Sequence, residues 1–436
     1  MPGSKIIHDC VHGSVKVEGL ILELLERPEM QRLHGVHQLG LAHYVFPGAN
    51  HTRLEHSLGT YHMAHLMSQS LQLPDDERRT LLVAALLHDI GHPPFSHTLE
   101  EVLQDRIGKD HMDVTTDIIR GRARLMKDNV AEVLGPLEPI SEVLEENDVN
   151  VEEVCELIAS SRKDLRSGQT LLVEEGQAHF GTKRYLGQMI SGPLDVDQMD
   201  YLKRDAYYTG VAHGTIDVDR LLQTVALFHG DLVINKGGLV AAEGLMVARA
   251  LMYTSVYYHK TARIAEQMLC KSVENSPSEL LVDLHLETDC SLASLLRSCP
   301  GPTSVLMTKL DYRRLYKRAL MLPISSLSDD RLDLLIDLSE YRKRKVKEKE
   351  IASRAGVPET AVLLDIPDRS LLLSELRIGK TDVPILDGDR VRPLSRYSPL
   401  AKAIQARGVH DWAVMVSTLP EHREEVERAT MKVLFD

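Results

Sequence analysis

The chain has few cysteines, no long apolar run and no excess of positive charge, and each absence excludes a class of protein. Its 5 cysteines are scattered without a C-x-x-C pair, so we expect reduced thiols and not a disulfide framework. No stretch reaches the roughly 18 apolar residues of a membrane span, and no apolar run follows the first residues as in a signal peptide. We therefore expect a cytoplasmic protein without a membrane partner.

The formal net charge of −13 at pH 7 argues against a general nucleic-acid binder, because affinity for the phosphate backbone needs clustered Lys and Arg. A pocket for a small phosphorylated ligand needs only local positive charge. The cations near the motifs described below that could supply it are Arg53, Lys203, Arg204, Arg249, Lys260 and Arg263. The charged run at 340–350 is interpreted as a solvated helix face, since its interleaved Glu residues weaken the alternative of a nucleic-acid contact.

Helical periodicity dominates the rest of the sequence. With 43% hydrophobic residues over 436 positions, the chain is expected to bury a large core and to have a second, smaller unit. The predicted elements are a hairpin at 5–19, helices from residue 20, one long core helix at 243–260, strands at 361–367, 383–386 and 412–417, and a closing helix at 422–434. The predicted fold class is mainly α, with one domain over 1–330 and a small C-terminal α+β subdomain over 331–436.

The stretch LLVAALLHDIGHPPFSH, residues 81–97, is the centre of the sequence. Its seven consecutive apolar residues predict a helix that is buried on most sides. The helix leads into His88 and Asp89, and Gly91 with the prolines after it should stop the helix. Ser96 is predicted to cap the next helix. The buried helix therefore delivers an imidazole and a carboxylate at a fixed, partly dehydrated end.

Two further residues could complete a metal site with His88 and Asp89. A bare His-Asp pair is equally well explained by a helix cap or by a satisfied core group. The chain also has His56, with Gly59 making room three residues later, and a distant Asp197. Two imidazoles and two carboxylates suit Mn, Fe, Zn or Mg better than a thiolate site would. We therefore predict that these two histidines and two aspartates hold one divalent metal ion.

The order of these ligands resembles the HD-domain metal-dependent phosphohydrolases. More narrowly, it resembles the deoxynucleoside triphosphate triphosphohydrolases, whose vertebrate member adds a sterile-alpha-motif domain. The matching segments lie within roughly residues 1–270 and are QLG (38–40), YVFPGA (44–49), RLEHSLG (53–59), LHDIGH (87–92), PFSH (94–97), DVD (195–197), DY (200–201) and RD (204–205). The resemblance implies an HD-type helical core, hydrolysis of dNTPs to deoxynucleoside and triphosphate, and a homo-oligomer, either a dimer or a tetramer.

The resemblance also implies roles for residues that could act on the phosphates. His97 would be a general acid or base, His111 its partner and His92 a phosphate contact. Each histidine could instead orient a metal ligand from outside the coordination sphere. Arg53 and Arg249 match phosphate-binding arginines, and the planar guanidinium suits that task. A surface ion pair is the alternative for a lone arginine.

The sugar side of the implied pocket would be formed by other residues. Gln38, Tyr201 and Asp205 match residues that hold the deoxyribose, and Tyr257 matches one that packs near the nucleotide. Leu39 matches a residue packed against C2′, where a ribose hydroxyl would find no partner, so selectivity for deoxynucleotides would follow. Simple core packing is the alternative for Leu39.

The chain departs from the vertebrate relative in three places. Gln198 stands where that relative has a Lys after its last metal Asp, so one phosphate-binding charge is missing. Met112 stands where it has a Glu, which weakens the case for an identical proton relay. At the guanine-reading activator site, Glu26, Gln31 and His34 stand in place of an Asp, a Gln and an Arg. Loss of that Arg argues against activation by a guanine nucleotide, although a nucleotide activator site of different preference could remain.

Two alternatives to a dNTP hydrolase share many of these residues. Another HD-domain phosphohydrolase, acting on a nucleoside monophosphate or a cyclic dinucleotide, would use the same metal ligands but should not need Gln38, Leu39 or Arg249. A non-catalytic nucleotide-sensing protein would bind without turnover. The presence of all four metal ligands together with His97 and His111 argues against the sensing protein.

Overall fold

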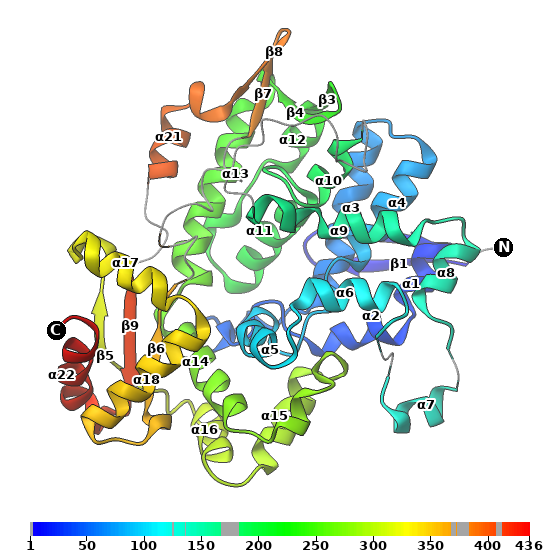
Figure 1. Cartoon of the computed structure of the whole chain (residues 1–436). Helices are drawn as coiled ribbons and strands as arrows, with labels where there is room; N and C mark the ends of the chain where they lie inside the picture. Colours follow the sequence, from blue (N-terminus) through cyan, green and yellow to red (C-terminus); the bar gives the residue numbers. More distant parts are fainter. Residues whose placement is uncertain are drawn as a thin grey trace.

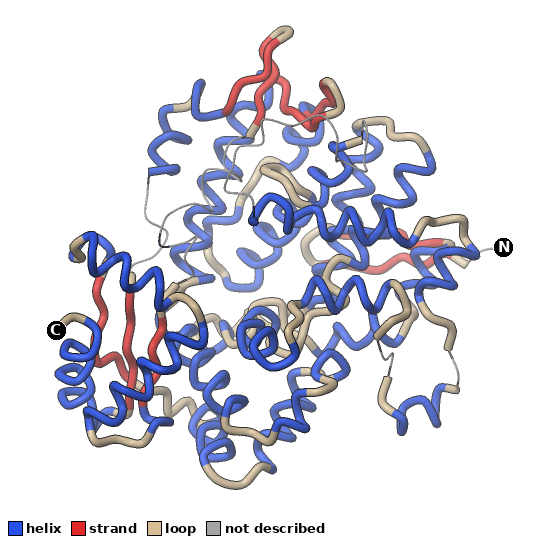
Figure 2. The backbone as a smooth tube through the Cα atoms, in the orientation of Figure 1, coloured by secondary structure: helices blue, strands red, loops and turns tan. Residues whose placement is uncertain are grey.

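The computed structural model describes residues 3–123, 126–135, 137–166, 183–367, 372, 383–406 and 412–436. Helices make up most of these ranges, and the strands within them form three small sheets (Figures 1 and 2). The predicted class, mainly α with a small α+β part near the C-terminus, is confirmed.

The N-terminal part begins with the predicted hairpin. Strand β1 (Ser4–Asp9) pairs antiparallel with β2 (Gly13–Glu18). Val15 and Val17 of β2 are fully buried, as expected for alternate residues that face a core. The short helices α1 (Leu20–Leu25) and α2 (Pro28–Arg32) follow, and Pro28 suits the first position of α2 because no helical partner is needed for its nitrogen.

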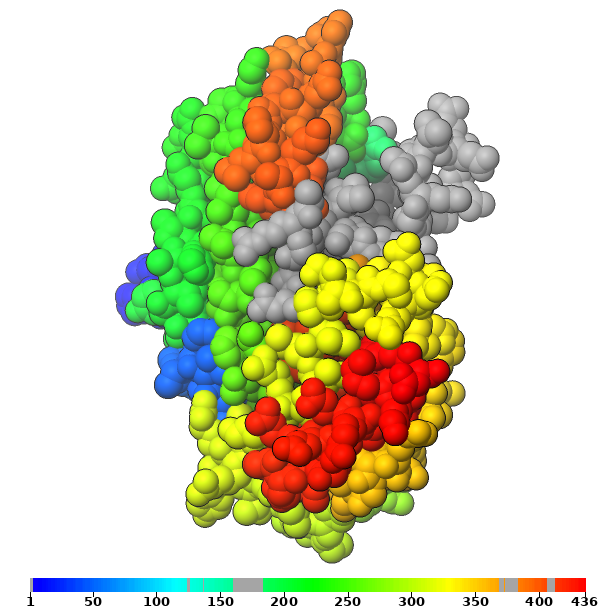
Figure 3. Space-filling view, turned by 90° about the vertical axis from the view of Figure 1, so that its left-hand side faces the viewer, coloured from blue at the N-terminus to red at the C-terminus, as the bar shows by residue number. Residues whose placement is uncertain are grey.

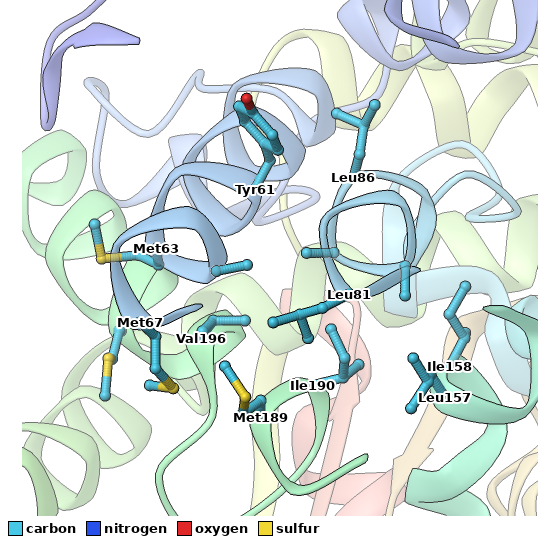
Figure 4. Packing of buried hydrophobic residues seen from close by; sticks show 14 of the residues in the cluster. Tyr61, Met63, Met67, Leu81, Leu86, Leu157, Ile158, Met189, Ile190 and Val196 are labelled. Atoms are coloured by element: carbon cyan, nitrogen blue, oxygen red, sulfur yellow. The ribbon is translucent and has the colours of Figure 1, made fainter. Parts of the chain in front are cut away.

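Three helices form the centre of the fold. Helix α3 (Arg53–Ser70) packs against α4 (Asp75–Leu87) and α11 (Val196–Thr209). Met63 and Met67 of α3 and Leu81 of α4 belong to one apolar cluster (Figure 4). The surrounding helices are α5 (Glu100–Ile107), α6 (His111–Ile119), α7 (Asp128–Leu134), α8 (Ile140–Glu146), α9 (Val151–Arg166), α10 (Arg184–Ile190) and α12 (Val218–Thr224).

Helix α4 behaves largely as its sequence predicts. Three acidic residues occupy its first turn, where they are favourable to the helix dipole. Most of its apolar second half is buried, and each buried Leu contributes about 1.5–3 kcal/mol. The helix ends at Leu87, and His88 is its C-cap. Gly91 lies beyond this end and is needed for close packing, because a Cβ there would lie 2.3 Å from the backbone nitrogen of Thr115.

The predicted long helix at 243–260 is interrupted. Helix α13 (Leu239–Met252) passes into a π-helical turn at Tyr253–Tyr257, and α14 (Lys260–Glu274) starts anew after His259. A π turn holds one more residue than an α turn and often occurs at functional sites. The prediction of one continuous helix is therefore wrong at its C-terminal end.

One helical stretch of the described residues, Lys236–Tyr257, has the length and apolar composition of a membrane span. The expectation that no stretch would reach this limit is wrong here. A single stretch is weak evidence, since the core helix of a globular protein passes the same test. Ala242, Leu245 and Met246 of this stretch belong to the apolar core that also contains α3 and α4.

The C-terminal sheet has the strand order β5-β9-β6. Strand β9 (Val414–Thr418) lies in the middle and pairs antiparallel with β5 (Lys317–Leu322) and β6 (Val362–Asp365). Helices α18 (Tyr341–Ala355) and α22 (Arg423–Leu434) pack on it, with α17 (Asp329–Leu338) nearby (Figure 1). The strands predicted at 361–367 and 412–417 and the closing helix are therefore confirmed.

The remaining strands form a third sheet, at the top of the molecule in Figure 1. Strands β3 (Val225–Phe228), β4 (Asp231–Asn235), β7 (Pro384–Asp387) and β8 (Arg390–Pro393) lie in that order. Figure 3 shows residues 383–406, in orange, far from the red C-terminal helix. Helix α21 (Pro399–Ala406) closes this region, while α15 (Asp289–Ser298) and α16 (Pro302–Asp311) lie below the core in Figure 1. Both sheets contain strands from either side of residue 330, and the domain division there stays a prediction.

Helix α18 contains the charged run, and one side of it is a solvated face, as interpreted from the sequence: Arg342, Lys343 and Lys349 are exposed. Arg344 and Glu348 are 3% and 1% exposed. Arg344 pairs with Glu101 of α5, and Glu348 pairs with Lys271 of α14. The two buried charges therefore attach the helix to its neighbours, so the solvated face accounts for only part of the run.

Candidate metal centre and catalytic histidines

The four predicted metal ligands converge on one point, and we call them the metal cluster. His56 Nε2 lies 3.0 Å from Asp197 Oδ1 and 3.6 Å from Asp89 Oδ2. His88 Nε2 lies 3.4 Å from Asp89 Oδ1 and 3.8 Å from Asp197 Oδ1. Donor atoms about 2.1 Å from one ion would be about 3.0–3.4 Å apart at octahedral or tetrahedral angles. The cluster therefore has nearly the dimensions of a coordination sphere.

Local structure fixes which nitrogen of each histidine faces the cluster. His56 Nδ1 lies 2.7 Å from Asp200 Oδ2, and His88 Nδ1 lies 2.9 Å from the carbonyl of Ala85. These acceptors hold the proton on Nδ1 and leave Nε2 as the ligand. Among the described residues, His88 Nε2 is buried without a hydrogen-bond partner. An unsatisfied buried nitrogen in a site with two imidazoles and two carboxylates fits a divalent metal ion.

A buried charge network supports His56 from behind. Asp200 also receives two hydrogen bonds of 2.9 Å from Arg204 and lies 2.6 Å from His12 Nε2. Burial opposes the charge of Asp200, but Arg204, His12 and His56 hold its pKa well below the usual range. Arg204 also donates to Asp9 at 2.7 Å and is fully buried. It is therefore not available to a phosphate, contrary to what the sequence suggested.

Gly59 makes room for this network, as predicted. A Cβ at Gly59 would lie 1.8 Å from Asp200 Oδ1 and 2.5 Å from Arg204 Nη2. Both atoms belong to buried, paired groups and cannot move aside cheaply. The glycine is thus required by the carboxylate that orients His56.

Arg53 lies beside the metal cluster and contacts it directly. Its Nη1 donates to Asp89 Oδ2 at 2.5 Å, and its Nε donates to Ser96 Oγ at 2.9 Å. Burial opposes the charge of Asp89, but Arg53, His88 and His92 hold its pKa well below the usual range. Asp89 is therefore ionised, as a metal ligand must be.

His92, His97 and His111 form a second group, which we call the histidine cluster. One ring nitrogen from each lies within 4.8 Å of those of the other two. The rings of His92 and His111 are stacked with centroids 4.1 Å apart, and His92 Nε2 lies 3.2 Å from Asp89 Oδ1. Asp89 therefore lies between the two clusters.

Glu100 of α5 joins two members of the histidine cluster. Its Oε2 lies 2.9 Å from His97 Nδ1, and its Oε1 is hydrogen-bonded to His111 Nδ1. Burial lowers the pKa of His111, but Glu100 outweighs it and the net shift is upward. Burial, then Arg53 and His111, hold the pKa of His92 well below the usual range. The cluster therefore combines a readily protonated imidazole with a neutral one.

Ser96 does not cap the following helix, and that prediction is wrong. Phe95 and Ser96 both have left-handed backbone, with φ of 60° and 54°. The chain then makes a 3-10 turn at Ser96–Leu99, without a side-chain cap, before α5 begins. Ser96 Oγ instead donates to the carbonyl of His37 at 2.6 Å. The hydroxyl thus holds the loop before His97 and not a helix end.

The residues predicted for the sugar side come together around Asp205. Tyr257 OH donates to Asp205 Oδ2 at 2.7 Å, and His51 Nε2 lies 2.7 Å from Asp205 Oδ1. The rings of Tyr201 and Tyr257 have centroids 6.1 Å apart. The π turn places Tyr253 5.1 Å from the ring of Tyr257. These tyrosines form an aromatic wall next to a carboxylate.

Arg249 and Gln38 complete this neighbourhood. The Arg249 guanidinium lies 5.5 Å from the ring of Tyr253. The backbone N–H of Gln38 donates to the carbonyl of His51 at 3.0 Å. Gln38 therefore lies next to the residue that contacts Asp205. Its Oε1 is buried without a hydrogen-bond partner in the described ranges. Leu39 is partly buried and packs against the main apolar core. The alternative explanation of Leu39 as a core residue therefore accounts for the buried part of its side chain.

The predicted activator residues lie elsewhere. Glu26 and Gln31 line a surface cavity of about 880 Å³ between the N-terminal hairpin, α1 and the segment around α7. His34 is not part of that lining. Glu26 pairs with Lys5 of β1.

Sequence reasoning missed several residues that hold the site together. His12 lies in the turn between β1 and β2, and His51 precedes the metal motif by only a few residues. Asp200 and Glu100 gave a weak signal, because each lies three residues, about one helical turn, after a predicted site residue. Tyr253 could not be assigned because the π turn was not predicted. Nothing in the sequence indicated His12, whose contact with Asp200 joins residues 188 positions apart.

The geometry agrees with the families that the chain matches. Residues 53–205 match the HD domain, and residues 216–435 match the HD associated region. The HD match spans His56, His88, Asp89 and Asp197, and it ends at Asp205. The chain belongs to the HD-domain phosphohydrolase family and has the HD associated region.

Individual relatives cover different shares of the chain. An uncharacterized protein of Methanocaldococcus jannaschii is 30% identical over 98% of this chain and 82% of its own length. The uncharacterized protein YwfO of Bacillus subtilis is 35% identical over 61% of this chain and 54% of its own length. Human deoxynucleoside triphosphate triphosphohydrolase SAMHD1 is 28% identical over 61% of this chain and 43% of its own length. The chain thus spans about half the length of the last two relatives.

Two solved structures share the fold. A hypothetical protein from Aquifex aeolicus has a TM-score of 0.69 at 25% identity and covers 98% of this chain and all of its own. A phosphohydrolase from Bacteroides thetaiotaomicron has a TM-score of 0.67 at 22% identity, with 96% and 100% covered. The shared fold therefore covers at least 96% of this chain and includes the HD associated region.

Proposed function

We propose that the protein is a metal-dependent hydrolase that cleaves dNTPs to deoxynucleoside and triphosphate. The observation that carries the proposal is the position of Asp89 between the metal cluster and the histidine cluster. A metal ion held by the metal cluster would supply an activated water close to the proton-transfer groups of the histidine cluster. The similarity to SAMHD1, which is named for this reaction, supports the choice of substrate.

The chemistry follows from the residues present. A divalent ion held by His56, His88, Asp89 and Asp197 would lower the pKa of a bound water from about 16 to about 7 and would draw charge from a phosphoryl oxygen. Attack of a water oxygen on the α-phosphorus forms one P–O bond, breaks the bond to O5′ of the sugar and releases a proton of that water to solvent. His97 donates a proton to the departing O5′, and Glu100 holds the His97 ring in place.

Other residues bind and orient the substrate in this proposal. Arg249 contacts the triphosphate, while Tyr201, Tyr257 and Asp205 hold the deoxyribose. Gln38 offers its Oε1, which has no hydrogen-bond partner among the residues that the structure describes, to the 3′ hydroxyl. Leu39 lies against C2′, where a ribose hydroxyl would lose its hydrogen bonds to water without replacement. Arg53 neutralises charge on the phosphate nearest the metal, and the neutral imidazole of His92 contacts the same phosphate through a hydrogen bond.

Incubation of the purified protein with each dNTP and either Mn²⁺ or Mg²⁺ tests the proposal. The expected products, separated by ion-exchange chromatography, are deoxynucleoside and tripolyphosphate, with NTPs cleaved more slowly. Orthophosphate or pyrophosphate as the only phosphate product would overturn it. A dNTP-dependent thermal shift without product in any metal would instead support a nucleotide-sensing protein.

Substitution of Arg249 separates the proposal from another HD phosphohydrolase. We expect Arg249→Ala to lower kcat/KM for dNTPs at least tenfold while hydrolysis of bis(p-nitrophenyl) phosphate is unchanged. Arg428→Ala, on an exposed part of α22, is the matched control. Equal activity of the two variants toward dNTPs would favour a monophosphate or cyclic dinucleotide as the substrate.

The finer properties are part of the same proposal. We propose a homo-oligomer, either a dimer or a tetramer, and a cytoplasmic location. We propose Mn, Fe, Zn or Mg as the metal, and a nucleotide activator without guanine preference at the cavity near Glu26 and Gln31. Light scattering with and without each nucleotide, and elemental analysis of protein purified without added metal, test these points.

A further inference from the structure

Asp289 is a buried carboxylate that lies far along the sequence from the HD motifs. It is the first residue of α15 and is 3% exposed. Its Oδ1 accepts a hydrogen bond from the backbone N–H of Phe95 at 2.6 Å. Its Oδ2 accepts from the backbone N–H of His37 at 3.0 Å and lies 2.5 Å from His37 Nδ1. One carboxylate therefore joins the segment before Gln38 to the segment before His97.

The backbone at Phe95 needs such support. Phe95 and Ser96 are consecutive non-glycine residues in the left-handed region, with φ of 60° and 54°. Each such residue costs about 1–3 kcal/mol and persists only when its surroundings hold it in place. Ser96 is held by His37 and Arg53. Asp289 holds Phe95 through its backbone N–H. His97 directly follows Phe95 and Ser96 in the sequence.

A second contact ties the same loop to the same helix end. Arg32 donates to the carbonyls of Ile90 at 3.1 Å and His92 at 2.7 Å, and also to that of Glu287 at 2.8 Å. The packing is close, since a Cβ at Gly35 would lie 2.6 Å from Thr288 Cγ2. The start of α15 is thus fastened to both segments that flank the proposed substrate.

We propose that Asp289, from the HD associated region, is a positioning residue for the reaction. It acts through the backbones of Phe95 and His37, and so fixes the distance between the segment carrying the acid His97 and the segment carrying Gln38. It touches neither the metal cluster nor the histidine cluster. The inference that kcat depends on Asp289 rests on the proposed function. The inference that Asp289 keeps the backbone of residues 95–97 in one conformation does not.

Two variants of Asp289 test the proposal by steady-state kinetics. Asp289→Ala removes all three acceptor contacts and should lower kcat for dNTPs about 10²-fold, since small displacements of a catalytic group have effects of this size. Asp289→Asn keeps an oxygen for Phe95 but places an NH₂ opposite the donors of His37, and should lower kcat about tenfold. KM should change less than kcat, and metal content should stay at the wild-type value. Glu279→Gln, an exposed carboxylate upstream of α15, should have no effect.

Hydrogen exchange measured by mass spectrometry provides a readout that does not depend on the substrate. In Asp289→Ala the amides of residues 95–97 should exchange at least tenfold faster, while those of 81–87 in α4 stay protected. If Asp289→Ala does not fold, Asp289→Asn decides alone. Exchange and kcat equal to wild type in a folded variant would overturn the proposal, as would loss of metal together with loss of protection throughout. If the wild-type protein hydrolyses no dNTP, the exchange result still stands as the test of the conformation of residues 95–97.

Discussion

The metal cluster contacts the histidine cluster through Asp89, but the two are held in different ways. The metal cluster takes ligands from α3, the end of α4 and the start of α11, and the His56 side chain is 1% exposed. Its histidines are each fixed by a second acceptor, Asp200 or the Ala85 carbonyl. In the histidine cluster the His97 side chain is 64% exposed and depends on Glu100. The histidines of the metal cluster are therefore held in fixed orientations, whereas His97 of the histidine cluster is accessible to a ligand.

The charges of the two clusters differ as well. Around the metal cluster, Asp89 and Asp200 are buried and strongly ionised through cationic neighbours. In the histidine cluster, one carboxylate raises the pKa of His111, while burial and cationic neighbours keep His92 neutral. Groups with pKa values pushed apart in this way are suited to proton transfer. The comparison therefore assigns charge neutralisation to one cluster and proton movement to the other.

The largest expected effect comes from removing a carboxylate of the metal cluster. Asp197→Asn should lower metal affinity and reduce kcat at least 10³-fold, because both metal-bound water and charge neutralisation depend on the ion. Elemental analysis and dNTP hydrolysis measure the two losses. Asp219→Asn, on an exposed part of α12, is the control. Wild-type metal content in the Asp197 variant would contradict the role of this residue as a ligand.

A substitution behind the metal cluster tests whether that cluster is as rigid as the contacts indicate. Gly59→Ala places a Cβ against Asp200 and Arg204, and overpacking of this kind costs about 1–3 kcal/mol. Chemical denaturation should show that loss together with weaker metal binding. Gly244→Ala in α13 meets no atom within 4 Å and should raise the free energy of unfolding by about 0.5–1 kcal/mol. Similar changes in both variants would contradict the tight packing at Gly59.

The metal cluster could be predicted from the sequence because its ligands follow helix signals. The apolar run of α4 gives the helix, and His88 and Asp89 follow directly at its end. The room at Gly59 was predictable for the same reason, since a helix places residues three or four positions apart on one face. The order of strands in the C-terminal part could not be predicted, because the pairing of β5 with β9 joins segments about 100 residues apart.

The contacts that support the site escaped prediction for a physical reason. His12 lies in a hairpin turn, and Asp289 lies at the start of a helix. At such positions the spacing of apolar residues does not indicate which side chains are buried or what they contact. The left-handed backbone at Phe95 and Ser96 is held by long-range hydrogen bonds, and local sequence preference alone would not predict it. The π turn after α13 likewise moved Tyr253 into a place that a regular helix would not give it.

The acid-base assignment is tested by the pH dependence of Glu100→Gln. Glu100 raises the pKa of His111 above its usual 6.5, and His111 and His97 lower that of Glu100, although burial opposes both shifts. The stabilisation by the pair should therefore be complete between about pH 4.5 and 6.5. It should be lost as the pH rises through the raised pKa of His111, or falls through the lowered pKa of Glu100.

Two measurements follow from this variant. Denaturation at several pH values should show the largest wild-type advantage near pH 6 and a smaller one above the raised pKa of His111. If the charged form of His111 supports proton donation, the alkaline limb of the kcat profile should move to lower pH in Glu100→Gln, with a roughly tenfold loss at pH 8. Glu101→Gln, which alters the partner of Arg344, should leave the profile unchanged. Parallel profiles in wild type and Glu100→Gln would remove the assignment of proton transfer to this cluster.

The smallest expected effect concerns Met112, which stands where the vertebrate relative has a glutamate. The histidine cluster already has its carboxylate, because Glu100 is hydrogen-bonded to His111 Nδ1 and to His97. A second carboxylate from Met112→Glu would add charge near an imidazole whose Nδ1 proton is already bound. We therefore expect less than a twofold change in kcat and no shift of the pH profile. An increase of tenfold or more would mean that Glu100 does not complete the proton relay. The histidine cluster would then lack a carboxylate at position 112.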